Sequence, residues 1–197
     1  MIHPIETESY RILETRVDLS HFRPASRAIV ERVIHASADA EYAASMILDD
    51  NSVDAGVHAL RAGAPVVCDV EMVRHGIHDI TAECHLPDVG DAASTRSALG
   101  MRAAAARHPT GAIVVVGCAP TALDEVVGLV HRGAFAPALV IGLPVGFVGA
   151  AESKARLRAS GLPAISNVGE KGGSAVAAAA VNALVRLAAR SSEGNTP

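Results

Sequence analysis

His35 closes an apolar run in the stretch RVIHASAD, and small polar residues follow it at once. Its imidazole, with an unperturbed pKa of about 6.5, can give and regain a proton near neutral pH. His35 is therefore a candidate proton donor or acceptor. The alternative is a structural histidine that ends a helix or packs against the core.

Three loops rich in glycine and small residues follow apolar runs: VVVGCAPTA, IGLPVGFVGAAESK and NVGEKGGSA. Each leads into a predicted helix, whose free N–H groups and dipole attract anions. Neither the order G-x-x-x-x-G-K-[ST] nor a G-x-G-x-x-G after a strand occurs, so the loops lack the usual nucleotide motifs. They favour an anionic ligand, whereas the simpler interpretation is that the glycines only make turns.

Two further groups carry charge near these loops. Arg96 stands between two hydroxyl residues in Thr95-Arg96-Ser97, and it is either a solvated arginine or a fork that binds a carboxylate. Glu152-Ser153-Lys154 is either an ordinary first helical turn with a solvated lysine or a buried pair that shapes a pocket.

A metal site and a hydrolase are both disfavoured by the motifs. His75 and His78, with Glu71 before them and Cys84-His85 after them, have the spacing of one helix face. A third and fourth ligand at a recognised zinc spacing are missing, so we expect no metal site. The sequence contains no G-x-S-x-G, and no spacing indicates a nucleophile–base pair.

Composition narrows the class of protein. Half of the 197 residues are hydrophobic and 19% are charged, which allows a substantial core. The net charge of −4 and the 3% of aromatic residues disfavour a nucleic-acid binder. We expect a soluble, cytoplasmic protein for three reasons. The three cysteines are scattered, the N-terminus lacks a signal-peptide pattern, and no apolar run reaches about 20 residues.

Five short apolar runs alternate with helical patterns, which predicts an α/β fold with a parallel sheet covered by helices on both faces. The runs are Pro65–Val70, Ile80–Leu86, Ala112–Gly117, Ala138–Leu143 and Pro163–Val168. The helical patterns are Ala92–Arg107, Thr121–His131, Ala150–Ala159 and Ser174–Arg190. The three glycine-rich loops then leave the same edge of the sheet, where open α/β sheets bind ligands.

The sequence predicts a single domain. Residues 1–62 form a helical N-terminal section, with helices expected at Arg23–His35, Glu41–Leu48 and Val53–Ala62. Residues 63–190 form the α/β core, and residues 191–197 form a polar, flexible tail.

Seven segments, spread from His3 to Leu184, resemble the precorrin-8X methylmutase family of cobalamin biosynthesis. In order they are HPIETESYRILE, RVIHASAD, AGAPVVCDVEMVRHGI, STRSALGM, GCAPTAL, PALVIGLPVGFVGAAESK and GEKGGSAVAAAAVNAL. The resemblance implies a three-layer, flavodoxin-like α/β/α sandwich with a five-stranded parallel sheet, assembled as a homodimer. It implies an isomerase that moves a methyl group from C-11 to C-12 of precorrin-8X to give hydrogenobyrinate, without cofactor or added metal.

The resemblance also assigns residues. The family's histidine beside the migrating methyl corresponds to His35, and the polycarboxylate substrate needs cationic and N–H contacts. The substrate-binding positions expected from the matching segments are Ser9, Thr95, Arg96, Ser97, Thr121, Ser153, Lys154, Gly172, Gly173 and Ser174. Two positions depart from the family pattern: Cys118 replaces an asparagine of GNAPTAL, and Ala38 stands where glycine is common.

Three alternatives remain open at this point. The substrate of the anaerobic pathway carries cobalt, so a cobalt-precorrin-8 methylmutase is one of them. A non-catalytic carrier of the corrinoid product is another. A flavodoxin-like protein that binds flavin or nucleotide is the third.

Overall fold

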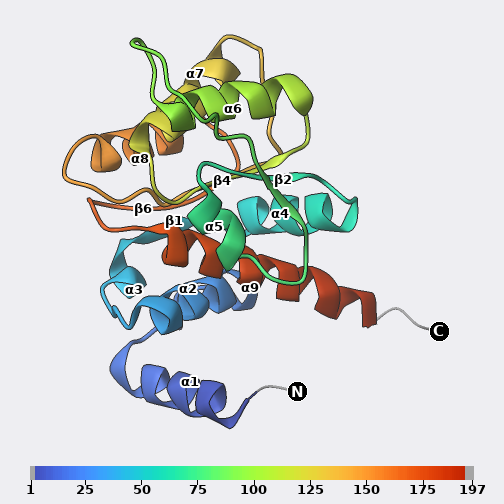
Figure 1. Ribbon diagram of the computed structural model, residues 1–197. Coiled ribbons are helices and arrows are strands. Elements are labelled where there is room, and N and C mark those ends of the chain that lie inside the picture. The colour runs from blue at the N-terminus through green and yellow to red at the C-terminus, as the bar shows by residue number, and fades with distance from the viewer. Residues whose placement is uncertain (1–2, 194–197) are drawn as a thin grey trace.

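The computed structural model describes residues 3–193, the last three by their backbone alone. This part of the chain forms nine helices and a six-stranded sheet (Figure 1). The helices are α1 (Pro4–Arg16), α2 (Pro24–Ser37), α3 (Tyr42–Ser45), α4 (Asp50–Arg61), α5 (Glu71–Gly76), α6 (Arg96–Arg107), α7 (Pro120–His131), α8 (Ala150–Ala159) and α9 (Ser174–Glu193). The strands are β1 (Met46–Leu48), β2 (Val66–Cys68), β3 (Ala82–Cys84), β4 (Ile113–Val116), β5 (Leu139–Gly142) and β6 (Ala164–Asn167).

The sheet has the order β1-β6-β5-β4-β2-β3, and the five strands β2 to β6 pair in parallel with one another. Each of these five strands lies inside one of the five predicted runs. Counted along the chain, they follow the flavodoxin-like order 2-1-3-4-5. The predicted α/β class is confirmed, while the predicted number of five strands is wrong by one.

The sixth strand, β1, comes from a segment that we expected to be helical. Of the predicted helix Glu41–Leu48, only Tyr42–Ser45 is helical, and the next three residues pair antiparallel with β6, Met46 opposite Asn167. A short apolar run such as Met46–Leu48 has no periodicity that separates helix from strand. Pairing with the free edge of β6, a contact distant in the sequence, decides its conformation.

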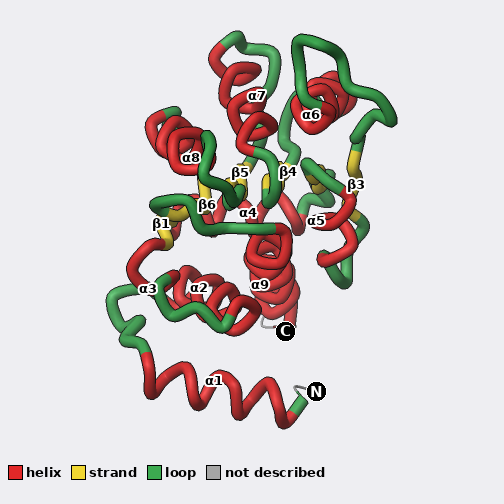
Figure 2. Tube along the Cα trace, turned by 60° about the vertical axis from the view of Figure 1, so that its left-hand side comes forward, coloured by secondary structure: helices red, strands yellow, loops and turns green. Residues whose placement is uncertain are grey.

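Helices cover both faces of the sheet, as Figures 1 and 2 show. Helices α6, α7 and α8 lie on one face, and α4, α5 and α9 lie on the other. Helix α2 packs on α9, and α1 packs on α2 as the outermost element. Strand β4 shows how the core divides: Ile113 and Val115 face one core cluster, while Val114 and Val116 face the other.

The ends of the helices refine the predictions. Helix α6 begins at Arg96 rather than at Ala92, because Thr95 caps its N-terminus. Helix α9 continues past the predicted end at Arg190 to Glu193, so the first residues of the expected tail are helical. The rest of that tail, residues 194–197, lies outside the described residues. No helix in residues 3–193 is long and apolar enough to cross a membrane.

Helices α1 and α5 were not predicted. Helix α1 has a good N-terminal signal: His3 accepts a hydrogen bond from the N–H of Ile5, and Pro4 occupies the first turn. Its apolar positions are few, and only Leu13 is buried, so periodicity gave little indication of it. The fold that these elements make brings the end of α2 and the loops after β4, β5 and β6 to one region.

Candidate active site

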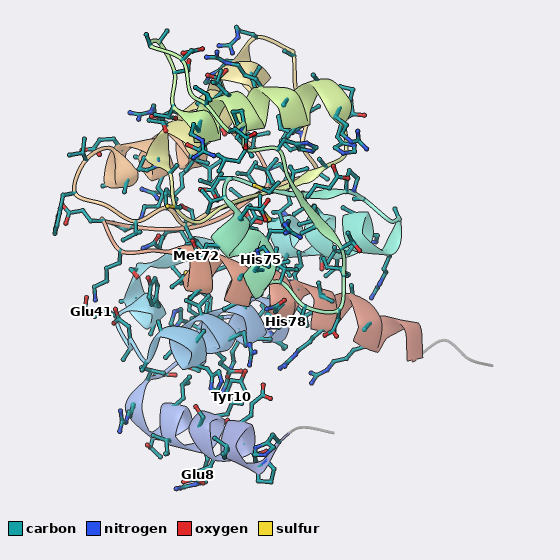
Figure 3. The ribbon with its side chains drawn as sticks, viewed as in Figure 1. Glu8, Tyr10, Glu41, Met72, His75 and His78 are labelled. Atoms are coloured by element: carbon teal, nitrogen blue, oxygen red, sulfur yellow. The ribbon has the colours of Figure 1, made fainter. Side chains whose placement is uncertain are left out.

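His35 lies in the last turn of α2 and faces α1. Its Nδ1 atom shares a hydrogen bond of 2.7 Å with the Oγ atom of Ser9. Its ring stacks on Tyr10 with a centroid distance of 5.1 Å and an angle of 23° between the planes. Figure 3 shows Tyr10 between α1 and α2, whereas Glu8 projects from the far side of α1. Two consecutive residues of α1 therefore fix the orientation of the imidazole.

A hollow of about 120 Å³ opens beside this histidine. It is lined by residues of α1, α2 and the segments that follow these two helices: Ser9, Ile12, Leu13, Arg16, Val17, Ile34, His35, Ala38 and Ala40. The chain leaves α2 at Ala38, which has the left-handed conformation with φ of 53°. The family position where glycine is common thus has a backbone that favours glycine, and alanine occupies it here.

The surroundings of His35 favour its neutral form. Burial lowers the pKa of His35 below its ordinary value, and the nearby charge of Arg32 acts in the same direction. The Glu6 carboxylate opposes them with a smaller effect. Within residues 3–193 the Nε2 atom of His35 has no hydrogen-bond partner. The site therefore presents a neutral imidazole with one ring nitrogen available for proton transfer.

An ion-pair network holds α1 beside this histidine. Glu6 of α1 accepts hydrogen bonds from Arg32 of α2 at 2.8 Å and from Arg186 of α9 at 2.7 Å. The bond from Arg186 holds the pKa of Glu6 below its usual range, with Arg32 contributing. The side chains of Glu6 and Arg32 are less than one-fifth exposed, so solvent screens this pair less than a surface pair.

On the other side of the sheet, three predicted hydroxyl residues lie together. The Oγ1 atom of Thr95 lies 2.7 Å from that of Thr121, at the start of α7, and 3.2 Å from the Oγ atom of Ser97. Thr95 and Thr121 are exposed, whereas Ser97 is buried. The N-termini of α6 and α7 thus meet through these hydroxyl groups.

Arg96 is exposed next to the same group of hydroxyls. Its Nε atom donates a 2.6 Å hydrogen bond to the carbonyl oxygen of Pro87, which orients the guanidinium. No carboxylate in the described part of the chain forms an ion pair with it. Its remaining N–H groups are free to bind an external carboxylate.

The loops after β5 and β6 are joined by their backbones. The N–H of Gly146 donates to the carbonyl of Glu170, and the N–H of Gly173 donates to that of Leu143. Gly172 has no room for a side chain, because a Cβ atom there would overlap the carbonyl oxygens of Leu143 and Pro144. The glycine at 172 is therefore needed for close approach of the two loops.

Two predicted binding residues are buried rather than facing solvent. Ser153 is fully buried and donates its hydroxyl to the carbonyl of Ala150. Lys154 is also fully buried, and its Nζ atom donates to Asn167 at 2.9 Å and to the carbonyl of Lys171 at 2.6 Å. Glu152 is exposed, so neither a solvated Lys154 nor a buried Glu152–Lys154 pair describes the structure.

Lys154 supports the loop after β6 from within the protein. Burial and, to a smaller extent, the charge of Arg158 lower its pKa to about 8. Ser174, another predicted binding residue, is the first residue of α9 and directly follows the loop that Lys154 contacts. The buried ammonium thereby positions Gly172 and Gly173.

A buried carboxylate that we did not single out anchors the GCAPT loop. Asp69, directly after β2, is 1% exposed and accepts hydrogen bonds from the N–H groups of Gly117, Cys118 and Ala119 at 2.8–3.1 Å. Burial raises its pKa, although the three N–H groups act in the opposite direction. Cys118, the departure from the family pattern, contributes its backbone to this anchor while its side chain is exposed.

Ion pairs of Lys171 connect the loop after β6 to the segment after α2. Lys171, in the loop after β6, pairs with Asp39 at 2.6 Å and with Glu41 at 2.8 Å, both beyond the end of α2. The parallel strands place the loops after β4, β5 and β6 on one edge, as predicted. These ion pairs join the segment after α2, the helix that carries His35, to the loop after β6, which carries Gly172 and Gly173.

The structure does not bring His75 and His78 together. Helix α5 ends at Gly76, so the two histidines do not share a helix face. Nδ1 of His75 bonds to the carbonyl of Glu71, and the N–H of His78 donates to Asn182 (Figure 3). Sequence reasoning also missed Tyr10 and Lys171, whose roles depend on contacts between distant segments.

Comparison with known proteins decides the family. The sequence model of the precorrin-8X methylmutase family matches residues 4–187. The chain belongs to this family. The cobalt-precorrin-8 methylmutase of Methanothermobacter thermautotrophicus is 44% identical over 176 residues, which are 86% of this chain and 84% of that protein. The precorrin-8X methylmutase of a Sinorhizobium species is 36% identical over 196 residues, 92% of this chain and 93% of that protein.

A solved structure agrees. The crystal structure of precorrin-8X methylmutase from Thermus thermophilus superposes with a TM-score of 0.85 at 37% identity, covering 95% of this chain and 96% of that one. The resemblance found in the seven segments is confirmed, and the chain is an isomerase of the corrin-forming methylmutase family. The roles of His35 and of the ten substrate-binding positions stay predictions.

Proposed function

We propose that this methylmutase moves a methyl group from C-11 to C-12 of precorrin-8X, giving hydrogenobyrinate, with His35 as the proton donor and acceptor. The observation that carries this assignment is the imidazole held by Ser9 and Tyr10, with its Nε2 atom free and a hollow beside it. An imidazole in that state can take or return a proton of the macrocycle.

The residue types fit an intramolecular shift. The methyl group leaves one ring carbon as it bonds to its neighbour, and the conjugated double bonds rearrange without a change in composition. The neutral imidazole of His35 takes a proton from the macrocycle as electron density moves along the conjugated system, and the imidazolium returns that proton at the end. Such a shift needs no nucleophile from the protein.

The sheet edge supplies groups that suit a large polycarboxylate. Arg96 offers free guanidinium N–H groups next to the hydroxyls of Thr95 and Thr121. Apolar side chains stand in the loop after β5, where Phe147 and Val148 are about nine-tenths exposed. We propose that carboxylates bind at Arg96 and that the flat ring packs against this loop. Ser153 and Lys154 then act by supporting the loops rather than by touching substrate.

The cobalt-containing macrocycle is the second candidate substrate. Relatives named cobalt-precorrin-8 methylmutase are 31% to 44% identical to this chain, and relatives named precorrin-8X methylmutase are 36% and 37% identical. The same rearrangement applies to both macrocycles. Assays with both substrates, compared by kcat/KM, distinguish the two.

We further propose that the protein works as a cytoplasmic homodimer. A hollow of about 120 Å³ is small beside the roughly 300–1,000 Å³ of typical ligand pockets, so a second chain would help to cover the macrocycle. The exposed Ile5 on α1 and Phe147 offer apolar surface for such contact. The free cysteines Cys68, Cys84 and Cys118 suit a reducing compartment. Light scattering of the purified protein tests the dimer.

Asp69 weighs against a flavin- or nucleotide-binding function. In flavodoxin-like sheets a ligand binds where the strand order reverses, which here is between β2 and β4. The N–H groups at that point are already bonded to the Asp69 carboxylate and are not available to a phosphate.

The decisive experiment is His35→Ala, with turnover followed by the visible spectrum of the corrinoid. We expect the variant to bind the macrocycle and to lose about 10²–10⁴-fold in turnover, the usual contribution of one general acid or base. His58→Ala is the matched control, because His58 is an exposed histidine of α4. A folded His35→Ala variant with normal turnover would contradict the assignment. Binding without turnover in the wild type would instead indicate a corrinoid carrier.

A further inference from the structure

Two histidines and a glutamate converge at the end of the sheet farthest from β1. The Nε2 atoms of His85 and His108 lie 2.9 Å and 3.1 Å from the same carboxylate oxygen, Oε2 of Glu83. The three ligand atoms lie within 4.8 Å of one another. All three side chains are between one-fifth and one-third exposed, so solvent and small ions reach them.

The fold itself brings these residues together. Glu83 belongs to the edge strand β3, and His85 follows two positions later, so both side chains point to the same face of the sheet. That face is covered by α6, and His108 is the residue that ends α6. Arg96 begins the same helix of 12 residues, so the cluster lies about 18 Å from the proposed carboxylate site.

We propose that Glu83, His85 and His108 bind a divalent transition-metal ion of the zinc type, at a site separate from the one that carries out the methyl shift. Two imidazole nitrogens and one carboxylate oxygen form a ligand set that suits zinc, with a water molecule as fourth ligand. When the ion enters, each neutral imidazole gives up its Nε2–H bond to Glu83, the proton exchanges through water to Nδ1, and Nε2 binds the ion, so no other reactant is required.

The charges around the cluster permit this exchange. His85, His108 and Arg107 all approach the same carboxylate oxygen, Oε2 of Glu83, at 2.9 to 3.4 Å, so this oxygen already interacts with N–H and cationic groups. Arg107 lies 3.4 Å from the same oxygen and is the competing cation. Its side chain is 65% exposed and can turn into solvent when an ion enters.

A bound ion would join strand β3 to the end of α6. Strand β3 is an edge strand that pairs on one side with β2. Coordination would fasten it to the end of α6 and stabilise the folded state, because an ion that binds only the folded protein raises its stability by mass action. The proposed role is therefore structural.

The test is calorimetric titration of the untagged protein with ZnCl₂, together with melting curves at increasing Zn²⁺ concentration. We expect one ion per chain and a Tm that rises with zinc. Replacing one of three ligands should weaken binding more than loss of an outer-shell partner, which typically costs 10–100-fold. We therefore expect at least about a ten-fold weaker affinity in His85→Ala and His108→Ala.

Two further variants keep the result interpretable. Glu83→Gln retains the shape of the side chain and can accept the same hydrogen bonds, so it tests the carboxylate if an alanine variant does not fold. His75→Ala removes an exposed histidine of α5 that also has a nearby glutamate, and it should bind zinc as the wild type does. Absence of stoichiometric zinc binding by the wild type, or equal affinity in the Glu83, His85 and His108 variants, would overturn the proposal.

Discussion

The hydroxyl of Ser9 and the Nδ1 atom of His35 form a 2.7 Å hydrogen bond between helices α1 and α2. Through this bond, α1 fixes which ring nitrogen of His35 remains available. A proton-transfer group depends on such orientation. The catalytic assignment of His35 therefore depends on α1 being in place.

Ser9→Ala should lower kcat while the protein remains folded. The ring of His35 would keep its stacking on Tyr10 but lose the bond that sets its rotation, and we expect roughly a ten-fold loss, less than the 10²–10⁴-fold for the general acid itself. Steady-state kinetics of the visible change measure it. Ser9→Thr retains the hydroxyl and should recover most of the activity. Equal kcat in Ser9→Ala and the wild type would show that the bond has no role in turnover.

The activity should persist below the ordinary pKa of histidine, about 6.5. Burial lowers the pKa of His35, so the neutral imidazole survives to lower pH. If that neutral form starts the reaction, kcat/KM should stay constant from pH 8 to about 6.5 and fall only at more acidic pH. The same shift means that the unfolded chain binds more protons near pH 6.5, so this contribution to stability is lost on acidification. An NMR titration of His35 with a midpoint above 6.5 would contradict both statements.

Arg96→Ala should weaken substrate binding more than it slows the bound substrate. A charge-assisted hydrogen bond contributes about 1.5–3 kcal/mol, which corresponds to roughly ten- to a hundred-fold in affinity. Binding of the corrinoid product, measured by titration, gives the dissociation constant directly. Arg102→Ala is the control on the same helix, since Arg102 is paired with Glu125 and should leave affinity unchanged. Unaltered affinity in Arg96→Ala would show that Arg96 does not bind substrate and that its role is limited to the hydrogen bond with the carbonyl of Pro87.

Ala38→Gly should stabilise the protein. Alanine at a φ of 53° carries the strain of the left-handed region, about 1–2 kcal/mol for a residue with a Cβ atom, part of which glycine offsets by its greater freedom in the unfolded chain. We expect a net gain of about 0.5–1 kcal/mol in urea unfolding. Ala36→Gly, two positions earlier within α2, should instead destabilise by a similar amount. A loss of stability in Ala38→Gly would contradict the statement that Ala38 is strained in the left-handed conformation.

The buried Lys154 should leave a signature at alkaline pH. Its pKa is about 8 in the folded protein and about 10.5 in an unfolded chain, so the folded state loses its proton first. Stability of the wild type relative to Lys154→Met should therefore rise from pH 8 to pH 10.5, where the charge no longer has to be buried. Between these two pKa values the stability difference should rise by about 1.4 kcal/mol for each pH unit. Parallel pH curves for the two proteins would contradict the lowered pKa.

The sequence predicted the parallel sheet well because β4 and β5 are continuous apolar runs, a local signal that burial on both faces requires. The loops that end in Thr121 and Ser174 could be placed for the same reason, since parallel strands must release them on one edge. Strand β1 could not be predicted, because its state is set by pairing with β6, more than a hundred residues away.

In the candidate site, too, features with a local sequence signal could be predicted and features set by distant contacts could not. The position of His35 in the last turn of a helix could be read from its motif, while its role stays a prediction, and the exposed Arg96 lies in the helix that the pattern predicted. The burial of Lys154 and the anchoring role of Asp69 depend on contacts between segments far apart in the chain, which residue types and spacing do not report. Tyr10 belongs to α1, whose weak periodicity concealed that it faces α2.

The three bonds to Asp69 have a consequence for how the edge of the sheet receives a ligand. A loop of glycine and alanine would ordinarily sample many conformations and lose that freedom when a substrate orders it, at about 1–2 kcal/mol per residue. Here the carboxylate orders Gly117, Cys118 and Ala119 during folding, so the entropy is lost before any substrate arrives. In the proposed binding mode, a rigid macrocycle then meets a surface that is already rigid, and more of the contact energy remains to hold it.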